Sequence, residues 1–230
     1  MTTLLRIDSS AQLEDRSLTR KLTALFTEEF LRMDQETQLI TRDVGKEPVP
    51  PIDHRFIHAA FTPPPQREDW MNQRLALSDQ LIDEVVSADV IVLGAPMYNY
   101  GMPSTLKVWI DHISRIGRTF SFDLSRGDFP IEPILVGKKL VVLSSRGEFG
   151  FGPGEVRGHM NALDPGIAAC AHYFGVATMD IATVAIEYQE FKDERHVQSV
   201  AQAEDKVRQL AQGLAAAGST GNLSAQLVAS

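Results

Sequence analysis

The sequence predicts a doubly wound α/β fold, in which five parallel strands in the order 2-1-3-4-5 carry helices on both faces. Three observations support this prediction. Short apolar runs alternate with longer amphipathic segments along the chain. The run from Val90 to Leu93 is wholly apolar, which suits a strand covered on both faces. Polar loops follow the first, third and fourth runs, and in such sheets a ligand binds where the carboxyl ends of the strands meet.

The expected elements alternate in the order that this fold requires. Residues 18–33 place Leu22, Phe26 and Phe30 on one face of a helix. Pro103 stands where the helix after the third strand could begin, because a first-turn residue needs no N–H partner. The predicted strands are 3–7, 38–44, 90–93, 139–144 and 176–186, and the predicted helices are 18–33, 70–86, the segment after Pro103, 164–174 and 191–217.

Length and composition fit a single domain of this kind. The chain has 230 residues, of which 43% are hydrophobic, and this is enough for a large core. We therefore expect one domain over residues 1–217 and a flexible C-terminal tail over the small and polar residues 218–230. The net charge of -8 argues against a nucleic-acid surface, which needs clustered lysines and arginines.

Cysteine content and hydropathy predict a cytoplasmic protein. The single cysteine, Cys170, has no partner for an internal disulfide and lies in an alanine-rich stretch. We interpret it as a small buried hydrophobe and not as a nucleophile. No signal peptide is recognisable, and no apolar run approaches the roughly 20 residues that cross a bilayer, so we expect no membrane contact.

The loop after the third strand is the clearest candidate for a binding site. Met97, Tyr98, Asn99 and Tyr100 combine flat apolar surface with amide and backbone hydrogen-bonding groups, without an acid or a base. Such a set suits a flat heterocycle. The alternative is that Tyr98 and Tyr100 only close the end of the sheet, and residue types alone do not separate the two interpretations.

A second candidate follows the first strand. Ser9 and Ser10 lead into a loop that ends at Ser17, and Thr19 stands in the first turn of the next helix. Unpaired N–H groups and the helix dipole favour an anion at such a position, so the loop is a phosphate site in principle. Ser17 could also serve only as the N-cap of the helix, and the two roles are compatible.

The loop after the fourth strand is rich in glycine but matches neither common nucleotide motif. Where the dinucleotide fingerprint needs its third glycine, the chain has Glu155 or Arg157. No glycine-rich loop ends in Gly-Lys-Ser or Gly-Lys-Thr. The pattern argues against a nicotinamide-type Rossmann domain and a P-loop NTPase. Small residues such as Gly147 would let backbone N–H groups approach the edge of a ligand.

Two longer segments interrupt the alternation. Residues 47–65 are rich in proline and predict an irregular surface excursion, in which His54 and His58 lack a third metal ligand, so we expect no metal. Residues 117–137 contain Phe120, Phe122 and three turn signals without a clean period, which indicates a lid beside the ligand loop. These phenylalanines could equally anchor a long loop.

Three motifs resemble those of one known family. The first motif consists of Pro-Met-Tyr-Asn-Tyr at 96–100, Pro-Ser-Thr-Leu-Lys at 103–107, and Asp111. It is similar to the flavin-contacting signature of the FMN-dependent NADH-azoreductases. These proteins are also described as NADH:quinone oxidoreductases and have a flavodoxin-like fold. Ser9-Ser10 with Arg-Ser-Leu-Thr-Arg at 16–20 is similar to the family's first loop, and residues 144–147 are similar to its loop after the fourth strand.

The resemblance implies a cofactor, substrates and an assembly. It implies FMN at a homodimer interface, NADH or NADPH as hydride donor, and quinones or azo compounds as acceptors in a ping-pong cycle without a catalytic side chain. Phe120, Phe122 and Tyr173 would line the substrate pocket, and a phenylalanine would reach over the flavin of one subunit or the other. The residues that it implies for FMN are Ser10, Ser17, Leu18, Thr19, Pro96, Met97, Tyr98, Asn99, Tyr100, Ser145, Arg146 and Gly147.

Two questions stay open from the sequence. Glu148 departs from the second glycine that is usual in the family, and its side chain could point outward or could alter the flavin potential through its charge. A flavodoxin-like electron carrier, or an FMN-binding regulator without turnover, is the alternative to the enzyme. Residues 47–65 and 117–137 would cover a ring that an electron carrier exposes. Rapid bleaching of bound flavin by NADH alone would separate the enzyme from both alternatives.

Overall fold

The computed structural model describes residues 1–228, with side chains described over residues 1–217. Its centre is a five-stranded parallel sheet in the order β2-β1-β3-β6-β7, in which β6 and β7 are the fourth and fifth strands of the sheet in chain order. The predicted fold class and the predicted order 2-1-3-4-5 are therefore confirmed. The strands are β1 (Thr3–Asp8), β2 (Gln38–Asp43), β3 (Val90–Gly94), β6 (Lys138–Ser145) and β7 (Val176–Ile186).

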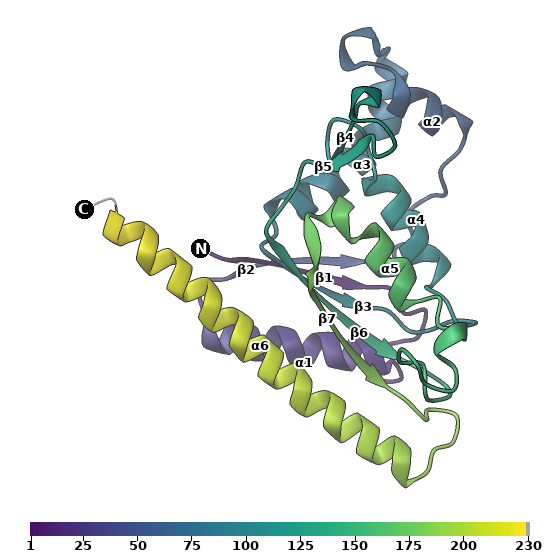
Figure 1. Cartoon of the computed structure of the whole chain (residues 1–230), viewed down its shortest axis with the longest axis vertical. Helices are drawn as coiled ribbons and strands as arrows, with labels where there is room; N and C mark the ends of the chain where they lie inside the picture. The colour runs from purple at the N-terminus through teal and green to yellow at the C-terminus, as the bar shows by residue number, and fades with distance from the viewer. Residues whose placement is uncertain (229–230) are drawn as a thin grey trace.

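Helices cover both faces of this sheet (Figure 1). On one face α1 and α6 pack together, and Phe26, Phe30 and Val207 are fully buried there. On the other face α3, α4 and α5 pack around Trp109 and Phe174, whose ring centroids lie 5.5 Å apart. Because β3 is covered on both sides, all its residues are buried. The helices are α1 (Leu18–Met33), α2 (His54–Phe61), α3 (Asp69–Ser87), α4 (Ser104–Ile113), α5 (Asp164–Cys170) and α6 (Glu194–Val228).

Two segments differ from the sequence-based expectation. Within residues 47–65, α2 begins after Asp53, whose carboxylate accepts the N–H of Phe56 at 2.8 Å. The prolines lie outside this helix and so do not interrupt it. Residues 117–137 contain an antiparallel hairpin of β4 (Phe120–Phe122) and β5 (Ile131–Pro133). Strands this short leave no period that a sequence could reveal.

The last helix is longer than expected, since α6 continues past residue 217. The flexible tail over residues 218–230 stays a prediction. Only the backbone is described for residues 218–228, and residues 229–230 lie outside the described part of the chain. Over the described residues, no helix combines the length and the hydropathy needed to cross a bilayer.

Because the strands are parallel, each connecting segment lies at one of two opposite ends of the sheet. We call them the carboxyl edge, where the strands end, and the amino edge, where they begin. The loops after β1, β3 and β6 lie at the carboxyl edge, whereas the β4-β5 hairpin precedes β6 and the 3-10 helix η4 (Ala171–Phe174) precedes β7. The N–H of Lys138 donates to the carbonyl oxygen of Gly175 at 3.1 Å, which joins the starts of these two strands. Figure 1 shows the hairpin beside α2 and α3, away from the arrowheads of the strands.

Candidate functional site

Three loops meet at the carboxyl edge of the sheet. The N–H of Ala11, in the loop after β1, donates to the hydroxyl of Tyr98 at 3.2 Å. The N–H of Met97, in the loop after β3, donates to the carbonyl oxygen of Ser145 at the end of β6, at 2.9 Å. The structure thus brings together the cofactor residues that the sequence predicts in three separate motifs.

The loop between β1 and α1 has the donors of an anion site. Ser10, Ser17 and Thr19 are buried, and the Oγ of Ser17 lies 3.3 Å from the Oγ1 of Thr19. Ser17 also caps α1, because its Oγ accepts the N–H of Arg20 at 3.3 Å, so the predicted N-cap is confirmed. Among the described residues, the N–H groups of Leu18 and Thr19 have no acceptor, as expected in a first turn. Hydroxyls, free N–H groups and the helix dipole together suit a phosphate.

A buried ion pair between Arg20 and Asp43 holds this loop in place. Arg20, only 2% exposed, donates to the carboxylate of Asp43 on β2 at 2.5 and 2.9 Å. It also donates to the carbonyl oxygens of Ser10 at 2.7 Å and Gln12 at 3.0 Å. The hydrogen bond to Asp43 raises the pKa of Arg20, so the guanidinium stays charged. The sequence indicates no role for Arg20, because its partner stands 23 positions away on another strand.

At Gly45 the backbone after β2 lies in close contact with the same loop, which the absence of a side chain permits. A Cβ atom at this position would lie 2.1 Å from the carbonyl oxygen of Ser10, which is far inside van der Waals contact. The N–H of Gly45 donates to the carbonyl oxygen of Asp8 at 3.2 Å. Any side chain here would displace the loop that carries the candidate phosphate site.

The loop between β3 and α4 contains a tight, strained turn. The N–H of Tyr98 and the N–H of Gly101 each donate to the other residue's carbonyl oxygen at 3.0 Å. Between them Asn99 and Tyr100 have φ angles of 48° and 68°, which is the pattern of a type I′ turn. Left-handed backbone costs a residue such as tyrosine about 1–3 kcal/mol, and such strain is typical of binding loops. Tyr98 and Tyr100 are 38% and 40% exposed, so part of each side chain is open to solvent.

The loop after β6 has two backbone N–H groups that no acceptor within the described chain engages. The carbonyl oxygens of Arg146, Gly147 and Glu148 accept N–H groups of residues 188–190 at 3.0 to 3.2 Å. In the described part of the chain, the N–H groups of Gly147 and Glu148 have no acceptor. These two donors are therefore available to acceptor atoms on the edge of a ligand.

Arg146 is engaged within the protein. Its side chain is 5% exposed and pairs with Asp164 at 2.6 Å and Glu187 at 3.5 Å. Its backbone N–H donates to the carbonyl oxygen of Ile186 at 2.8 Å. These contacts tie the end of β6 to α5 and β7. The predicted contact between Arg146 and the cofactor stays a prediction, and the observed contacts give Arg146 a bracing role.

The predicted substrate residues lie together, but at the opposite edge of the sheet. The rings of Phe120 and Tyr173 have centroids 5.1 Å apart, and burial raises the pKa of the Tyr173 hydroxyl. Phe122, on the same hairpin, is 48% exposed. Within one chain the structure does not bring these residues to the three loops.

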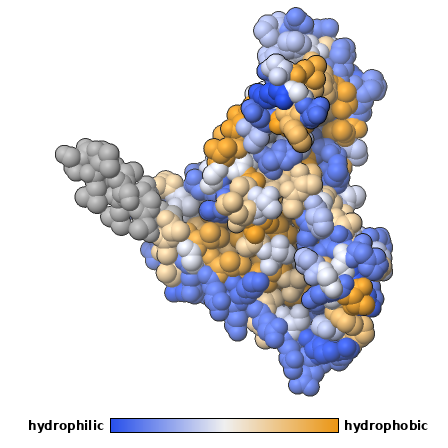
Figure 2. Space-filling model, viewed as in Figure 1, coloured by the Kyte–Doolittle hydropathy of each residue, from blue (hydrophilic) through white to orange (hydrophobic). Residues whose placement is uncertain are grey.

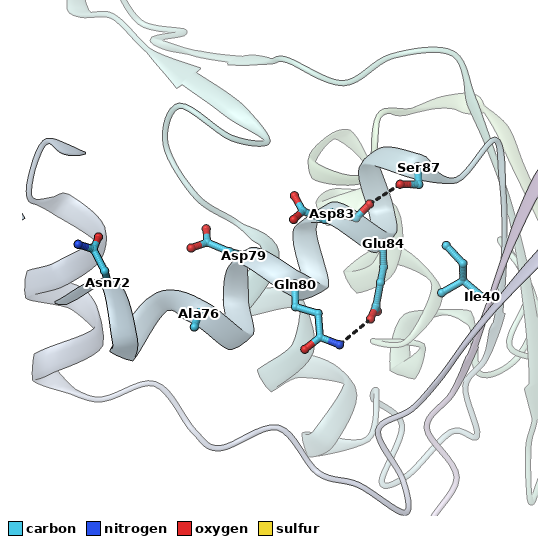
Figure 3. Close-up of a pocket in the computed structure, with 8 residues that line it drawn as sticks. All are labelled: Ile40, Asn72, Ala76, Asp79, Gln80, Asp83, Glu84 and Ser87. Carbon is cyan, nitrogen blue, oxygen red and sulfur yellow. Dashed lines mark hydrogen bonds between the residues drawn. The ribbon is translucent and has the colours of Figure 1, made fainter. Parts of the chain in front are cut away.

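Figure 3 shows an acidic hollow along α3, with the carboxylates of Asp79, Asp83 and Glu84. Arginine side chains that this view does not draw already engage these carboxylates. Asp79 accepts from Arg115 at 2.7 Å and from Arg118 at 2.6 Å. Glu84 accepts from Arg42. Among the residues that the structure describes, no group of three or more His, Cys, Asp or Glu side chains is placed to hold a metal ion.

The fold and the site define a class of protein. It is a doubly wound α/β protein whose carboxyl edge combines a candidate anion site at the start of α1 with two loops that suit a flat ring carrying hydrogen-bond acceptors.

The chain belongs to the family of FMN-dependent NADH:quinone oxidoreductases. A family described as having a flavodoxin-like fold matches residues 2–211. The chain is 44% identical to FMN-dependent NADH:quinone oxidoreductase 2 of Colwellia psychrerythraea, over 93% of this chain and 100% of that protein. It is 47% identical to the protein of the same name from Idiomarina loihiensis, over 93% of this chain and 91% of that protein. The family predicted from the three motifs is confirmed.

Solved structures agree on the fold. An azoreductase from Bacillus anthracis superposes with a TM-score of 0.81 at 19% identity, over 93% of this chain and 100% of that chain. An FMN-dependent NADH-azoreductase from the same species, in complex with FMN, superposes with the same TM-score at 18% identity, over 94% of this chain and 100% of that chain.

Proposed function

We propose that the chain is an FMN-dependent oxidoreductase that transfers two electrons from NADH to quinones and azo compounds. The observation that carries the proposal is the joining of three loops at one edge, through Ala11 to Tyr98 and Met97 to Ser145. The predicted oxidoreductase class, FMN cofactor and NADH donor agree with the names of relatives that are 44% and 47% identical over 93% of the chain.

The free donors of the first loop would hold the FMN phosphate. The N–H groups of Leu18 and Thr19 and the hydroxyls of Ser10, Ser17 and Thr19 would surround it. The Arg20 side chain would not hold the phosphate, because its guanidinium is engaged by Asp43 and by carbonyl oxygens of the loop itself. The site would therefore recognise the phosphate through N–H groups, hydroxyls and the dipole of α1.

The other two loops would hold the isoalloxazine ring. Pro96 to Tyr100 would lie along one side, and the N–H groups of Gly147 and Glu148 would face the carbonyl edge of the ring. Bound FMN supplies a centre that accepts a hydride at one time and releases two electrons at another. Backbone donors at the carbonyl edge would stabilise the negative charge that reduction adds there.

A single pocket over the ring would serve both halves of the cycle. The nicotinamide donor, NADH or NADPH, would leave before the quinone or azo acceptor binds, which predicts ping-pong kinetics. The protein's part is to bind and orient, because the β3-α4 loop carries no acid or base from Pro96 to Tyr100. Protons for the product would come from water.

A homodimer would complete this pocket. Phe120, Phe122 and Tyr173 lie at the opposite edge from the three loops, so a partner subunit would supply them. The hairpin and its surroundings expose apolar surface, and orange patches are visible in the upper part of Figure 2. The exposed apolar side chains there include Phe61, Phe122, Leu124, Phe129 and Ile131. Surface of this kind favours a protein interface. We further propose a cytoplasmic protein with one FMN in each single-domain subunit.

Steady-state kinetics of the FMN-loaded protein test this function. Initial rates at several fixed concentrations of a water-soluble quinone should give parallel double-reciprocal lines against NADH. Intersecting lines would overturn the ping-pong order while leaving the activity in place. Retained flavin without NADH:quinone turnover would instead favour the electron carrier or the regulator.

Thr19→Val tests the phosphate site, with Thr27→Val as its matched control. Thr27 is buried in the same helix, and its hydroxyl donates to the carbonyl oxygen of Thr23 at 2.8 Å, so the two variants lose similar groups. Only Thr19→Val should weaken FMN binding, by about tenfold for the loss of one hydrogen bond to a charged group. Equal FMN affinity in both variants would contradict the proposed phosphate site.

A further inference from the structure

Glu148 stands where the two ring-facing loops meet. Its Oε1 lies 2.9 Å from a terminal nitrogen of Arg157, and its Oε2 lies 3.5 Å from the hydroxyl of Tyr100. Tyr100 belongs to the strained turn after β3, and the N–H of Glu148 is one of the free donors after β6. The carboxylate is therefore placed between the two loops proposed to hold the isoalloxazine ring.

Arg157 is fixed independently of this ion pair. Its backbone N–H donates to the carbonyl oxygen of Gly150 at 2.8 Å, and its side chain donates to the carbonyl oxygen of Phe149 at 3.1 Å. Its guanidinium carbon lies 4.7 Å from the centroid of the Phe149 ring. These contacts close the glycine-rich loop and hold the cation beside Glu148. The charge pair is thus part of a folded loop and not two free surface side chains.

We propose that Glu148 and Arg157, which form a charge pair, each shift the reduction potential of the bound flavin, in opposite directions. The inference rests on the proposed function and on the position of the ring that goes with it. Reduction adds negative charge to the ring, so a nearby carboxylate disfavours the reduced form and a nearby guanidinium favours it. With both side chains present the two effects offset each other.

The size of the effect follows from exposure. The side chains of Arg157 and Glu148 are 24% and 37% exposed, so solvent and salt screen their fields in part. We expect each single charge to change the relative affinity for reduced and oxidised FMN by about tenfold, which for a two-electron couple is about 30 mV. Higher ionic strength should reduce the shift.

The pair could instead only keep the loop closed. A purely structural role would weaken the binding of oxidised and reduced FMN by the same factor, and the potential would not move. The two roles therefore differ in a measurable quantity other than activity.

The experiment measures midpoint potentials of the FMN-loaded protein by anaerobic titration against reference dyes, together with the dissociation constant of oxidised FMN. Glu148→Gln should raise the potential by about 30 mV, and Arg157→Gln should lower it by a similar amount. The double variant should return to within about 15 mV of the unmodified protein, a threefold change in relative affinity. Arg157→Lys keeps the charge but loses the planar guanidinium, so it should keep the potential near its original value.

Glu29→Gln and Arg32→Gln are the matched controls. These residues form an exposed ion pair at 2.7 Å in the last turns of α1, the end opposite to the candidate phosphate site. Their removal should leave the potential unchanged. Equal potentials in Glu148→Gln, Arg157→Gln and the unmodified protein would overturn the inference while the proposed function stands. Failure to retain FMN, or retained FMN that NADH cannot reduce, would instead overturn the proposed function.

Discussion

The two edges of the sheet are built in contrasting ways. At the carboxyl edge the β1-α1 loop is fixed by the buried Arg20–Asp43 pair and by the close approach of Gly45. At the amino edge the β4-β5 hairpin exposes Phe129 to 85% and Phe122 to 48% of their surface. Buried contacts within one chain hold the β1-α1 loop at the first edge, whereas the second edge exposes large apolar side chains.

We expect the two edges to have different roles, one in cofactor binding and the other in acceptor binding. A cofactor that stays bound needs a preorganised site, and buried hydrogen bonds provide one at the carboxyl edge. Residues that determine which acceptor binds can differ between related proteins without loss of the cofactor. Surface loops and hairpins tolerate such substitutions with little loss of stability. We therefore expect substitutions at the carboxyl edge to change FMN affinity and those at the amino edge to change acceptor preference.

The largest effect is expected from Arg20→Met. The change leaves the carboxylate of Asp43 unpaired and frees the carbonyl oxygens of Ser10 and Gln12. We expect the apoprotein to lose about 3 kcal/mol of unfolding free energy, measured by urea denaturation, and FMN to bind about a hundredfold more weakly, measured by flavin fluorescence.

Arg32→Met is the control for this prediction. Arg32 lies on the same helix with its side chain 60% exposed, and its loss should cost under about 0.5 kcal/mol. If Arg20→Met bound FMN as tightly as Arg32→Met does, the buried pair would not preorganise the site.

A smaller effect is expected from Asn99→Ala. The change removes the side-chain amide and places alanine at a φ of 48°, so FMN should bind about tenfold more weakly or be reduced more slowly. Asn99→Gly loses the same amide but tolerates the backbone angle, and the pair of variants separates the two contributions. Unchanged FMN affinity and unchanged turnover in Asn99→Ala would argue against the assignment of this loop.

The amino edge should respond differently. Phe122→Ala removes an exposed ring and should leave stability and FMN affinity unchanged. Phe120→Ala removes a ring packed on Tyr173 and should also cost about 3 kcal/mol of stability. In both variants the ratio of kcat/KM for a quinone and an azo dye should shift by about fivefold, the scale of a lost apolar contact. If neither ratio changes, the hairpin takes no part in acceptor binding.

The smallest effect is a pH dependence of the unfolding free energy, and it involves a histidine at neither edge. His112 on α4 is fully buried, and burial lowers the pKa of its imidazole. The unfolded chain therefore binds a proton more readily than the folded chain, so its contribution to stability is complete above about pH 6.5 and is lost as the pH falls below that value. Thermal unfolding between pH 7.5 and 5.5 should show this loss.

His112→Gln should remove this component of the pH dependence, and His54→Gln, at an exposed position, should retain it. A slope that is the same in both variants would mean that other groups cause the acid destabilisation.

The sequence predicts the sheet and the position of the site because both depend on local patterns. Apolar runs give the strands, and polar residues directly after the first, third and fourth sheet strands mark the carboxyl edge. The N-cap at Ser17 is local in the same sense. The resemblance to a family added the identity of the cofactor, which no pattern in the chain reveals by itself.

The parts that the sequence does not predict depend on distant pairs or on very short elements. Arg20 meets Asp43 from another strand, and Arg146 meets Asp164 and Glu187 from two further elements. The three-residue strands of the hairpin have no readable period. The direction of the Glu148 side chain likewise depends on Arg157, nine positions further along a loop whose closure the sequence does not show.

The decisive measurement is the visible spectrum of the FMN-loaded, desalted protein, followed anaerobically after addition of NADH. We expect a retained yellow flavin band that bleaches with NADH and returns when a quinone is added. Loss of the flavin on desalting, or a retained band that NADH does not bleach, would contradict the proposed function.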